Sequence, residues 1–462
     1  MKKQPVGCFF IEYYRYSAIY RKAKYFLVTF AGQIFNLNMK ILLLGSGGRE
    51  SALSWKMKQS PLCEALYIAP GNAGTAQYGQ NIAMGINDFE AIKAFCLEQE
   101  IDTLFPGSED PLVNGVYDFF KNDEALKNIT IVGPSKAGAE LEGSKDFAKE
   151  FMQRHNIPTA AYATFDATNF EAGLAYLEQH STPIVLKADG LAAGKGVVIT
   201  SDKEEARKVF TDMIKGNQFG SAGARVVIEQ FLTGIELSVF AFTDGKNFVI
   251  LPEAKDYKRI GEGDTGLNTG GMGAISPVPF AAGTFMDKVM EQVVKPTVAG
   301  LAEEKITYQG FIFFGLIKVA DEPYVIEYNC RMGDPETEVV MPRLQNDLLE
   351  MIQHLDDQSL DKVQVQHDPR AACTVMLVAG GYPEDYAKGD VISGIDQVTN
   401  SIVFHAGTKQ EGAQVLTNGG RVLAVTSYGD NIQDALAQSY DSIQQISFSH
   451  QNYRKDIGYE FK

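Results

Sequence analysis

The chain has 462 residues and a formal net charge of −16, with 45% hydrophobic and 22% charged residues. This length favours about three domains, each able to bury a core, and the composition is that of an ordinary globular protein. The acidic balance excludes general binding to nucleic acid or to anionic membranes, because no basic field is present to attract phosphates. Any phosphate that the protein binds must therefore meet local positive groups.

Thiol and imidazole groups are too dispersed for a disulfide framework or a zinc site. The five cysteines and six histidines are scattered, and no C-x-x-C pair occurs. An odd number of cysteines fits a reducing cytoplasm. No apolar run reaches the roughly 18 residues that a membrane-spanning helix needs. We therefore expect a cytoplasmic protein with no membrane partner.

Residues 1–38 differ in composition from the rest of the chain. They contain ten Phe or Tyr and six Lys or Arg, with Glu12 as their single acid. Polar residues interrupt any apolar core that a signal peptide would need. Met39 then begins Met-Lys-Ile-Leu-Leu-Leu-Gly, which is typical of a first strand. We expect residues 1–38 to be an extension that is untranslated or disordered; the alternative is a basic aromatic arm that contacts a partner or membrane surface.

The segment 39–142 predicts an α/β domain, because strands alternate with helices and imply a parallel sheet. The expected strands are 40–44, 65–69, 103–106 and 129–132, and the expected helices are 51–58 and 89–99. Binding loops of such a sheet lie at the carboxyl ends of its strands. The candidate substrate contacts in these loops are Gly47, Gly48, Arg49, Asn72 and Glu109.

The turn after the first strand, Gly-Ser-Gly-Gly-Arg-Glu, suits a single phosphate or carboxylate, because it opens a helix and carries Arg49. It does not fit a dinucleotide fingerprint. Glu50 stands at the third glycine position, and no acid ends the second strand. Glu109, in the loop 106–111, either faces the same crevice or is simply an acid at a helix start.

The run from Pro183 to Thr200 predicts a hairpin that closes over a polyphosphate. Apolar strands flank a loop with three glycines, which let backbone N–H groups approach an anion, and Lys187 and Lys195 add positive charge. It is not a Walker loop, because Gly196 stands where Ser or Thr would bind magnesium. Considered alone, the run also fits an ordinary glycine-rich hairpin with surface lysines.

The run from Tyr324 to Asn329 predicts a strand in which Glu327 and Asn329 project from the same face. A carboxylate and an amide oxygen side by side suit Mg²⁺, which completes its coordination with phosphate oxygens and water. Arg331 follows at once, and a cation beside a metal pair suits a reacting carboxylate and a transferring phosphoryl group. The alternative is an edge strand whose polar residues face water.

Two further segments of the central domain carry candidate contacts. Residues 225–232 predict a strand whose end offers backbone groups to an adenine edge, and Glu236 beyond it is placed to accept from ribose hydroxyls. Residues 256–273 contain too many glycines for a helix and too many polar groups for a core. They predict a mobile loop that brings Lys258, Arg259, Asp264 and Asn268 to a substrate.

Taken in order, these segments resemble the ATP-grasp ligases and, among them, the phosphoribosylamine–glycine ligase family. The matching text includes GSGGRESAL, APGNAGT, KADGLAAGKGVV, DTGLNTGGMGAISP and VIEYNCRMGDPETE, and the resemblance runs from Met39 to Lys462. It implies an α/β and α+β multidomain fold: a parallel-sheet domain at 39–142, an ATP-grasp domain at 143–346 with a glycine-rich lid at about 158–232, and a small C-terminal α+β domain at 347–462.

The resemblance also implies a reaction and its site. ATP, glycine and 5-phosphoribosylamine would give N1-(5-phosphoribosyl)glycinamide, ADP and phosphate through glycyl phosphate, in purine synthesis. The implied ATP contacts are Lys145, Lys187, Gly194, Lys195, Glu229, Gln230, Phe231, Leu232 and Glu236. Glu327 and Asn329 would hold Mg²⁺ or Mn²⁺. The implied catalytic residues are Arg331, Asp334 and Lys258, with Asp256, Asn268 and Glu336 as further substrate contacts. We expect a monomer with small-molecule partners only.

The sequence departs from the family pattern at three positions. Ser51 stands where the family usually has His, and Lys255 and Tyr257 replace the commoner Gln and His. In the last domain, His405 is expected to be a structural histidine, and Arg421 is a candidate for the sugar phosphate. The alternatives to the implied function are another ATP-grasp ligase that joins a carboxylate to a different amine, and a catalytically silent nucleotide-binding module.

Overall fold

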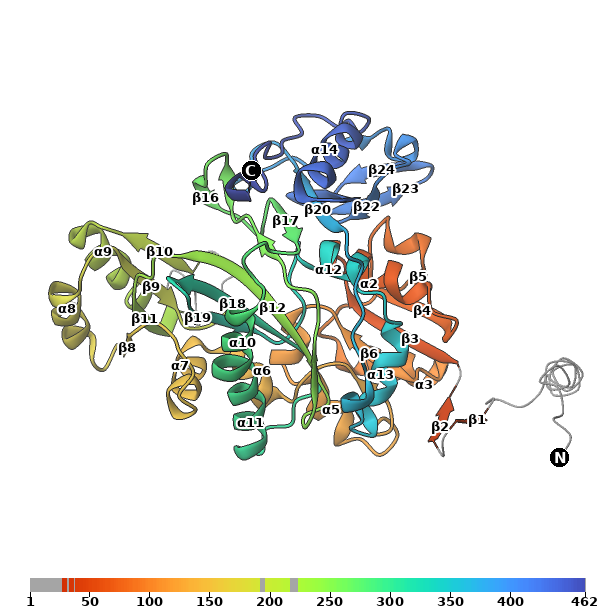
Figure 1. The fold of residues 1–462 in the computed structure, drawn as a ribbon, viewed down its shortest axis with the longest axis horizontal. Coiled ribbons are helices and arrows are strands. Elements are labelled where there is room, and N and C mark those ends of the chain that lie inside the picture. Colours follow the sequence, from red (N-terminus) through yellow and green to blue (C-terminus); the bar gives the residue numbers. More distant parts are fainter. Residues whose placement is uncertain (1–26, 31–32, 37, 192–195, 217–222, 462) are drawn as a thin grey trace, which may run out of the picture.

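The computed structural model describes residues 27–30, 33–36, 38–191, 196–216 and 223–461, arranged as several lobes around a central sheet (Figure 1). The predicted lid contacts Gly194 and Lys195 lie outside the described residues. Strands β1 (Leu27–Phe30) and β2 (Gln33–Asn36) form an antiparallel hairpin ahead of the first domain. None of the helices in the described part of the chain is long and apolar enough to cross a membrane.

The first domain is built on a parallel sheet, as predicted, but it has five strands instead of the four expected, in the order β5-β4-β3-β6-β7. Its strands are β3 (Met39–Gly45), β4 (Cys63–Pro70), β5 (Gln80–Asn81), β6 (Thr103–Pro106) and β7 (Thr130–Ile131). The helices around it are α2 (Gly48–Lys58), α3 (Phe89–Gln99), α4 (Glu109–Val113), α5 (Val116–Lys121) and α6 (Lys136–Gly143), with a 3₁₀ turn η1 (Thr75–Gln77). The sheet's carboxyl ends therefore carry the turn before α2 and the loop before α4.

The central sheet is antiparallel in the order β13-β12-β18-β19. Its strands are β12 (Ile235–Thr243), β13 (Phe248–Ile250), β18 (Gly310–Val319) and β19 (Glu322–Asn329). The associated helical segments are α7 (Lys145–Arg154), α10 (Thr284–Val289), the π-helical turn η3 (Met290–Val294), α11 (Lys295–Glu303), α12 (Thr337–Arg343), α13 (Leu348–Asp356) and η4 (Leu360–Lys362).

The first domain and the central sheet share two hydrophobic cores. Leu42 on β3 packs in the same core as Val239 on β12, whereas Leu43 and Phe240 belong to the other. Successive side chains of a strand point to opposite faces, so β3 and β12 each contribute to both cores. This shared packing fixes β19 relative to the loops of the first domain.

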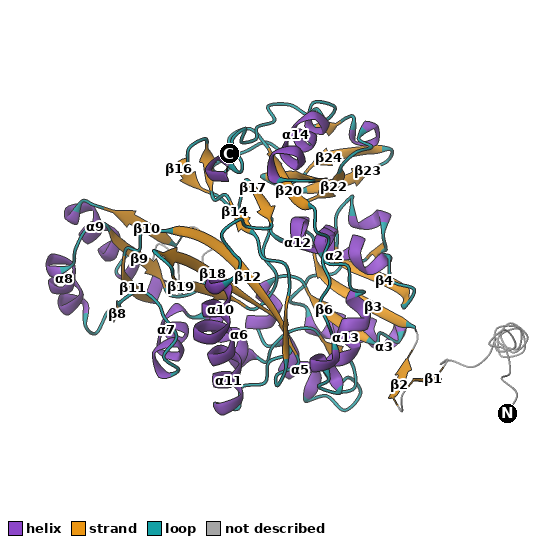
Figure 2. Ribbon diagram, viewed as in Figure 1, coloured by secondary structure: helices purple, strands orange, loops and turns teal. Residues whose placement is uncertain are grey.

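The lid has a hydrophobic core of its own. Strands β8 (Tyr162–Asp166), β9 (Ile184–Ala188), β10 (Val197–Thr200) and β11 (Arg225–Gln230) form an antiparallel sheet in the order β10-β9-β11-β8. Helices α8 (Phe170–Gln179) and α9 (Lys203–Ile214) cover it, at the far left of Figure 2. Phe165, Leu186, Phe210 and Ile228 form a cluster separate from the central cores. Such packing suits a unit that moves as a whole.

Two strands of the C-terminal sheet come from the middle of the chain. Its order is β14-β17-β20-β25-β22, where β14 (Lys255–Asp256) and β17 (Gly273–Ser276) precede the domain in sequence. The other strands are β20 (Ala371–Val378), β22 (Ile402–His405) and β25 (Arg421–Gly429), and α14 (Ile432–Ile443) packs on β20 and β25. A small sheet of β21 (Val391–Ile392), β23 (Thr408–Glu411) and β24 (Gln414–Thr417), and 3₁₀ turns η5 (Ile395–Gln397) and η6 (Tyr459–Phe461), complete this part.

Residues 256–273 are more regular than the loop expected from their composition. Strands β15 (Arg259–Gly261) and β16 (Thr265–Asn268) form a hairpin between β14 and β17. Gly263 and Asp264 make its turn with φ angles of 63° and 54°, and the absence of a Cβ makes such a conformation inexpensive for the glycine. The predicted loop therefore contains a hairpin, which long-range contacts from Arg454, Asp456 and Tyr459 hold.

Candidate active site

The lid lysine lies against the strand that carries the predicted metal ligands. The Lys187 side chain, at the end of β9, donates a hydrogen bond from Nζ to the carbonyl oxygen of Ile326 at 3.3 Å. Ile326 is the residue immediately before Glu327 on β19. The lysine-bearing hairpin and the strand with the acid–amide pair, whose contacting residues are 139 positions apart in sequence, therefore lie together in the fold.

Strand β19 is irregular where it presents its polar pair. Glu327 pairs with Gly315 and Asn329 with Phe313, but the register then shifts so that Ile326 has no partner in the ladder. Such a bulge re-aims side chains and is common beside active sites. A Cβ at position 315 would lie 3.0 Å from Cγ of Glu327, so Gly315 gives the carboxylate its room.

These two side chains fit a divalent cation that is shared with a phosphate. The oxygens of Glu327 and Asn329 are hard ligands of the kind that Mg²⁺ prefers. In the part of the chain that the structure describes, no group of three His, Cys, Asp or Glu side chains forms a metal cluster. A cation at β19 would therefore complete its coordination with oxygens from a bound substrate and from water.

The Glu229 carboxylate forms ion pairs with two lysines. Its Oε2 lies 3.0 Å from Nζ of Lys187 and 3.2 Å from Nζ of Lys149, a residue that the sequence analysis did not single out. Burial raises the pKa of Glu229, but the two ammonium groups outweigh it and the pKa is lowered overall. Burial lowers the pKa of Lys149 to about 8. Glu229 thus holds Lys187 in place.

The predicted adenine segment, residues 229–232, has two residues in β11 and two beyond its end. The backbones of Glu229 and Gln230 belong to the sheet ladder, and Gln230 donates from its backbone N–H to Ala161. Phe231 and Leu232 follow the strand, and Phe231 is 37% exposed. The backbones of Glu229 and Gln230 are paired within the sheet. An adenine contact therefore remains a prediction for Phe231 and Leu232.

Lys145 faces the base of the glycine-rich loop. Its Nζ donates to the carbonyl oxygens of Asp189 at 3.3 Å and Gly190 at 3.1 Å. Burial lowers the pKa of Lys145, against the opposing effect of Glu327. A cavity of 490 Å³ borders this contact, and Ser144, Asp189, Gly190 and Arg225 are among its lining residues. The lysine is therefore held against the backbone at the start of the glycine-rich loop, beside this cavity.

Lys258 forms an ion pair with the predicted ribose contact. Its Nζ lies 2.6 Å from Oε2 of Glu236, and both side chains are more than 40% exposed. Partial desolvation of the ammonium group would lower the pKa of Lys258, but the charges of Asp256, Glu236 and Glu327 outweigh it and raise the pKa well above the ordinary value. Glu236 thus remains accessible while it is paired, and Lys258 is cationic.

Glu336 and Asp256 are two acids whose charges influence each other, and Lys258 acts on both. Burial, with the nearby charge of Asp256, raises the pKa of Glu336 to about 7. Ser238 donates to its Oε1 at 2.9 Å. Burial also raises the pKa of Asp256. Asn268, by contrast, is exposed on β16, opposite Arg259, and lies outside this buried cluster.

Arg331 is held between two acids. Its guanidinium donates to Glu109 at 3.2 Å and to Glu142 at 2.5 Å. Burial raises the pKa of Glu109, but Arg331 and Arg49 outweigh it and lower the pKa to about 2. Glu142 also accepts from the backbone N–H of Cys330 at 2.8 Å. Glu142 was not predicted from the sequence, because no local pattern distinguishes it from the other acid on helix α6.

Asp334 joins the first domain to the last. It lies 3.0 Å from the guanidinium of Arg421, and it accepts from the backbone N–H of Arg49 at 3.3 Å. The buried carboxyl of Glu338 lies beside it, and burial followed by the Asp334 charge raises the pKa of Glu338 well above its usual range. Arg421 also donates to the Asp334 carbonyl at 2.8 Å. Asp334 is thus a structural centre as well as a candidate catalytic group.

The two glycines before Arg49 make room for these acids. A Cβ at Gly48 would lie 2.2 Å from Oε1 of Glu338, and one at Gly47 would lie 3.1 Å from Oδ2 of Asp334. The backbone N–H of Gly47 donates to Glu50 at 2.6 Å. Glu50 therefore occupies the inside of this turn, where a dinucleotide fold would use its third glycine.

Asn72, a predicted substrate contact, has its side-chain polar atoms hydrogen-bonded within the protein. Its side chain amide donates to the carbonyl oxygens of Ser46 and His405 at 2.9 and 2.8 Å, and its Oδ1 accepts from the backbone N–H groups of Gly74 and Thr75. The residue is 5% exposed. Asn72 thus ties the first domain to the last, and its polar atoms are used within the protein.

Each of the three departures from the family pattern has a partner in this chain. Ser51 accepts a hydrogen bond at 3.1 Å from the backbone N–H of His405. Lys255 and Tyr257 both contact Glu460, at 2.9 and 2.8 Å respectively. All three contacts connect the C-terminal domain to earlier segments, so these residues have structural roles.

His405 is structural, as expected from the sequence. It is 2% exposed, its Nδ1 lies 3.0 Å from Thr408 Oγ1, and burial lowers its pKa to about 4. The unfolded imidazole takes a proton below about pH 6.5, whereas the folded one resists until about pH 4. Stability is therefore lost as the pH falls through this window.

We expect this effect to cost about 1.4 kcal/mol near pH 5.5. In His405→Gln, the difference in thermal midpoint between about pH 7.5 and about pH 5.5 should be smaller than in the wild type. The same replacement at the exposed His367 serves as the control. An equal pH dependence in wild type and His405→Gln would contradict the assignment.

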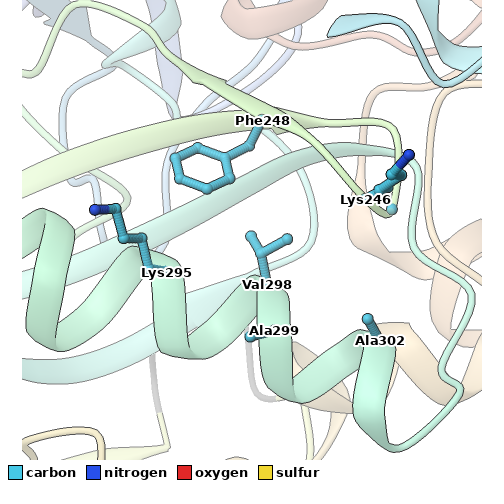
Figure 3. A pocket seen from close by; sticks show the side chains of 7 residues that line it. Lys246, Phe248, Lys295, Val298, Ala299 and Ala302 are labelled. Carbon is cyan, nitrogen blue, oxygen red and sulfur yellow. The ribbon is translucent and has the colours of Figure 1, made fainter. Parts of the chain in front are cut away.

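A second cavity lies apart from these residues. It has a volume of 320 Å³ and lies between the β12–β13 turn and helix α11 (Figure 3). Lys246 and Phe248 border one side, and Lys295 and Val298 lie along the helix. None of the candidate contacts in the described part of the chain lines it, so it is not part of the candidate active site.

Comparison with protein families matches three consecutive models. The N domain of phosphoribosylglycinamide synthetase matches residues 39–142, its ATP-grasp (A) domain matches residues 143–337, and its C domain matches residues 372–460. Together they span most of the chain.

Individual relatives agree with the family models. A phosphoribosylamine–glycine ligase of Vibrio cholerae is 50% identical over 426 residues, which cover 91% of this chain and 98% of that protein. The Haemophilus influenzae protein of the same name is 47% identical with the same coverage. A solved phosphoribosylamine–glycine ligase from Thermotoga maritima has a TM-score of 0.78 and 33% identity, covering 90% of this chain and 99% of that one.

A more distant solved structure is similar in fold alone. The biotin carboxylase domain of Hydrogenobacter thermophilus 2-oxoglutarate carboxylase, solved with MgADP, ADP and bicarbonate, has a TM-score of 0.67 and 15% identity. It covers 90% of this chain and 92% of its own.

Proposed function

Since the chain belongs to the phosphoribosylglycinamide synthetase family, we propose that it joins glycine to 5-phosphoribosylamine. The products are N1-(5-phosphoribosyl)glycinamide, ADP and phosphate. The chain is an ATP-dependent ligase of purine biosynthesis. The alternative, a catalytically silent nucleotide-binding module, is disfavoured because the candidate lysines and acids of the site stand together.

One observation carries the proposal. Lys187 of the lid donates to the backbone of Ile326, immediately before Glu327. A cationic hairpin thus faces a pair of oxygen ligands, which is the arrangement that a nucleoside triphosphate and its divalent ion require.

The proposed reaction has two steps. An oxygen of the glycine carboxylate attacks the γ-phosphorus of ATP and ADP leaves, which gives glycyl phosphate. The amine of phosphoribosylamine then attacks the acyl carbon, the C–O bond to phosphate breaks, and the nitrogen loses a proton. Lys145 and Lys187 would hold the phosphates, and Arg331, restrained by its two acids, would orient the reacting carboxylate.

The remaining contacts belong to the same proposal. Glu327 and Asn329 would hold Mg²⁺, or Mn²⁺ in its place, and the ion supplies charge neutralisation at the transferring phosphoryl group. Glu236 and the segment after β11 would bind the nucleoside. Lys258 would stabilise negative charge, and Asp256 and Glu336, the acids whose pKa values burial raises, would accept the proton that leaves the amine.

We further propose that the enzyme is a cytoplasmic monomer. All of the assigned residues come from one chain, so the site needs no partner subunit. The four cysteines in the described part of the chain are free thiols, which fits a reducing compartment.

Substrate omission tests the proposed function. With Mg-ATP, ADP release should require both glycine and phosphoribosylamine, because the acyl phosphate is consumed only when the amine is present. Coupled measurement of ADP and mass spectrometry of the product provide the readout. Equal ADP release when phosphoribosylamine is replaced by another amine would favour a different ATP-grasp ligase, and release without any amine would contradict the reaction.

A further inference from the structure

Residues 255–258 alternate between two environments. Lys258 points to Glu236, and the charges of both act on the Asp256 carboxyl. Lys255 and Tyr257 instead point to the C-terminal segment. Successive side chains of an extended strand face opposite sides. One short segment, of which β14 is the first half, therefore presents a site face and an anchoring face.

The Glu460 carboxylate contacts both side chains of the anchoring face, Lys255 and Tyr257. Oε1 of Glu460 lies 2.9 Å from Nζ of Lys255, and Oε2 accepts from the hydroxyl of Tyr257 at 2.8 Å. The Lys255 ammonium also lies 3.9 Å from the centre of the Tyr257 ring. Lys255 and Tyr257 are 6% and 1% exposed. The three groups form a closed, largely buried cluster in which each contacts the other two.

Other residues of the C-terminal segment 454–460 anchor the β15–β16 hairpin, which follows residues 255–258 in the chain. Arg454, with a fully buried side chain, lies 2.6 Å from Oδ1 of Asp264 at the tip of the β15–β16 hairpin. The hydroxyl of Tyr459 donates to the other oxygen of Asp264 at 3.0 Å, and Asp456 accepts from the Gly263 backbone at 2.7 Å. Figure 1 shows the C-terminus beside β16. Lys258 thus lies between two anchored points.

We propose that Glu460 is a positioning residue for the ligase reaction. By fixing Lys255 and Tyr257 it sets the position of this segment, and so it holds Lys258 against Glu236, with Asp256 on the same face. Glu460 touches no substrate; it acts through the residues between. This inference rests on the proposed function, because Asp256 and Lys258 are assigned to the reaction there.

The test compares Glu460→Ala with Glu460→Gln. Glutamine keeps a carbonyl oxygen that accepts from Tyr257 or Lys255, whereas alanine removes both contacts. We expect Glu460→Ala to lower kcat by about 10- to 100-fold, because a misplacement of roughly 1 Å has that effect. Glu460→Gln should recover most of the loss. Lys455→Ala, at an exposed residue of the same segment, is the control and should retain wild-type turnover.

A double-mutant cycle separates positioning from a general loss of folding. In a Lys258→Met background, Glu460→Ala should produce little additional loss of kcat, because the group that it positions is already absent. A purely structural role would add its full effect in both backgrounds. Thermal midpoints of all variants, measured in the same samples, show whether each remains folded.

Turnover of these variants and the additivity of their losses decide the proposal. Turnover of Glu460→Ala within twofold of the wild type would overturn it, and so would equal losses in the wild-type and Lys258→Met backgrounds. Non-additive losses with recovery by glutamine would support it. Each series includes wild-type enzyme with glycine or phosphoribosylamine omitted. A wild type without substrate-dependent turnover overturns the proposed function and this inference together, whereas a competent wild type confines the failure to Glu460.

Discussion

Replacing Glu327 with glutamine should lower turnover by at least about 100-fold, the size of effect seen when a charge that stabilises a phosphoryl or acyl transition state is removed. The change keeps the shape of the side chain but removes the charge that a divalent ion requires. Because Glu327 has a glycine opposite it on β18, the isosteric amide should fit without strain. Steady-state ADP release at saturating substrates measures the loss.

A matched control lies on the same strand. Glu322, at the other end of β19, is exposed and pairs with Lys288, so Glu322→Gln should retain wild-type turnover. A second readout does not depend on catalysis. In the wild type, Mg²⁺ added with ADP should raise the thermal midpoint, and Glu327→Gln should lose this ion-dependent increment. Turnover within twofold of the wild type would remove Glu327 from the metal site.

Lys187→Met should lower kcat/KM for ATP by about 100- to 1,000-fold, because it removes the lid cation that faces β19. The fold should survive the change. Glu229 keeps the second lysine, Lys149, 3.2 Å from its Oε2, so its buried carboxylate is not left without a counter-charge. Initial rates over a range of ATP concentrations, together with thermal midpoints, provide the measurement.

Lys149→Met is the matched comparison. Either replacement leaves Glu229 with one lysine, so the electrostatic cost to the buried carboxylate is of the same kind in both variants. Only Lys187 also contacts the backbone beside Glu327. Lys149→Met should therefore reduce the thermal midpoint while most of the activity remains. Equal losses of activity in the two variants would show that the pair acts through the fold alone.

Local sequence patterns were sufficient for the elements that carry the site. The alternation in β19 placed Glu327 and Asn329 on one face, and the apolar runs of β3, β6 and β9 were predicted as strands and observed as such. These features depend on periodicity and glycine content, which neighbouring residues determine. The combination of motifs was specific enough to indicate the ATP-grasp fold and the ligase activity.

Such local patterns did not identify contacts between residues that are distant in sequence. Asn72 was expected at a substrate, yet its amide bridges the first and last domains. Glu142, Glu338 and Lys149 were not singled out, although each contacts or lies beside a predicted site residue. The hairpin inside residues 256–273 was missed because its anchors, Arg454 and Asp456, lie about 190 residues away.

The amino-acid sequence by itself determined which chemistry this chain carries: the strand with its acid and amide, the glycine-rich hairpin with its lysine, and the order of the domains. The tertiary structure alone decided which of the polar residues are free to act and which are used as internal connections. The physical reason is that periodicity is a local property, whereas the pairing of a buried charge is settled by whatever distant group the fold brings within hydrogen-bonding distance.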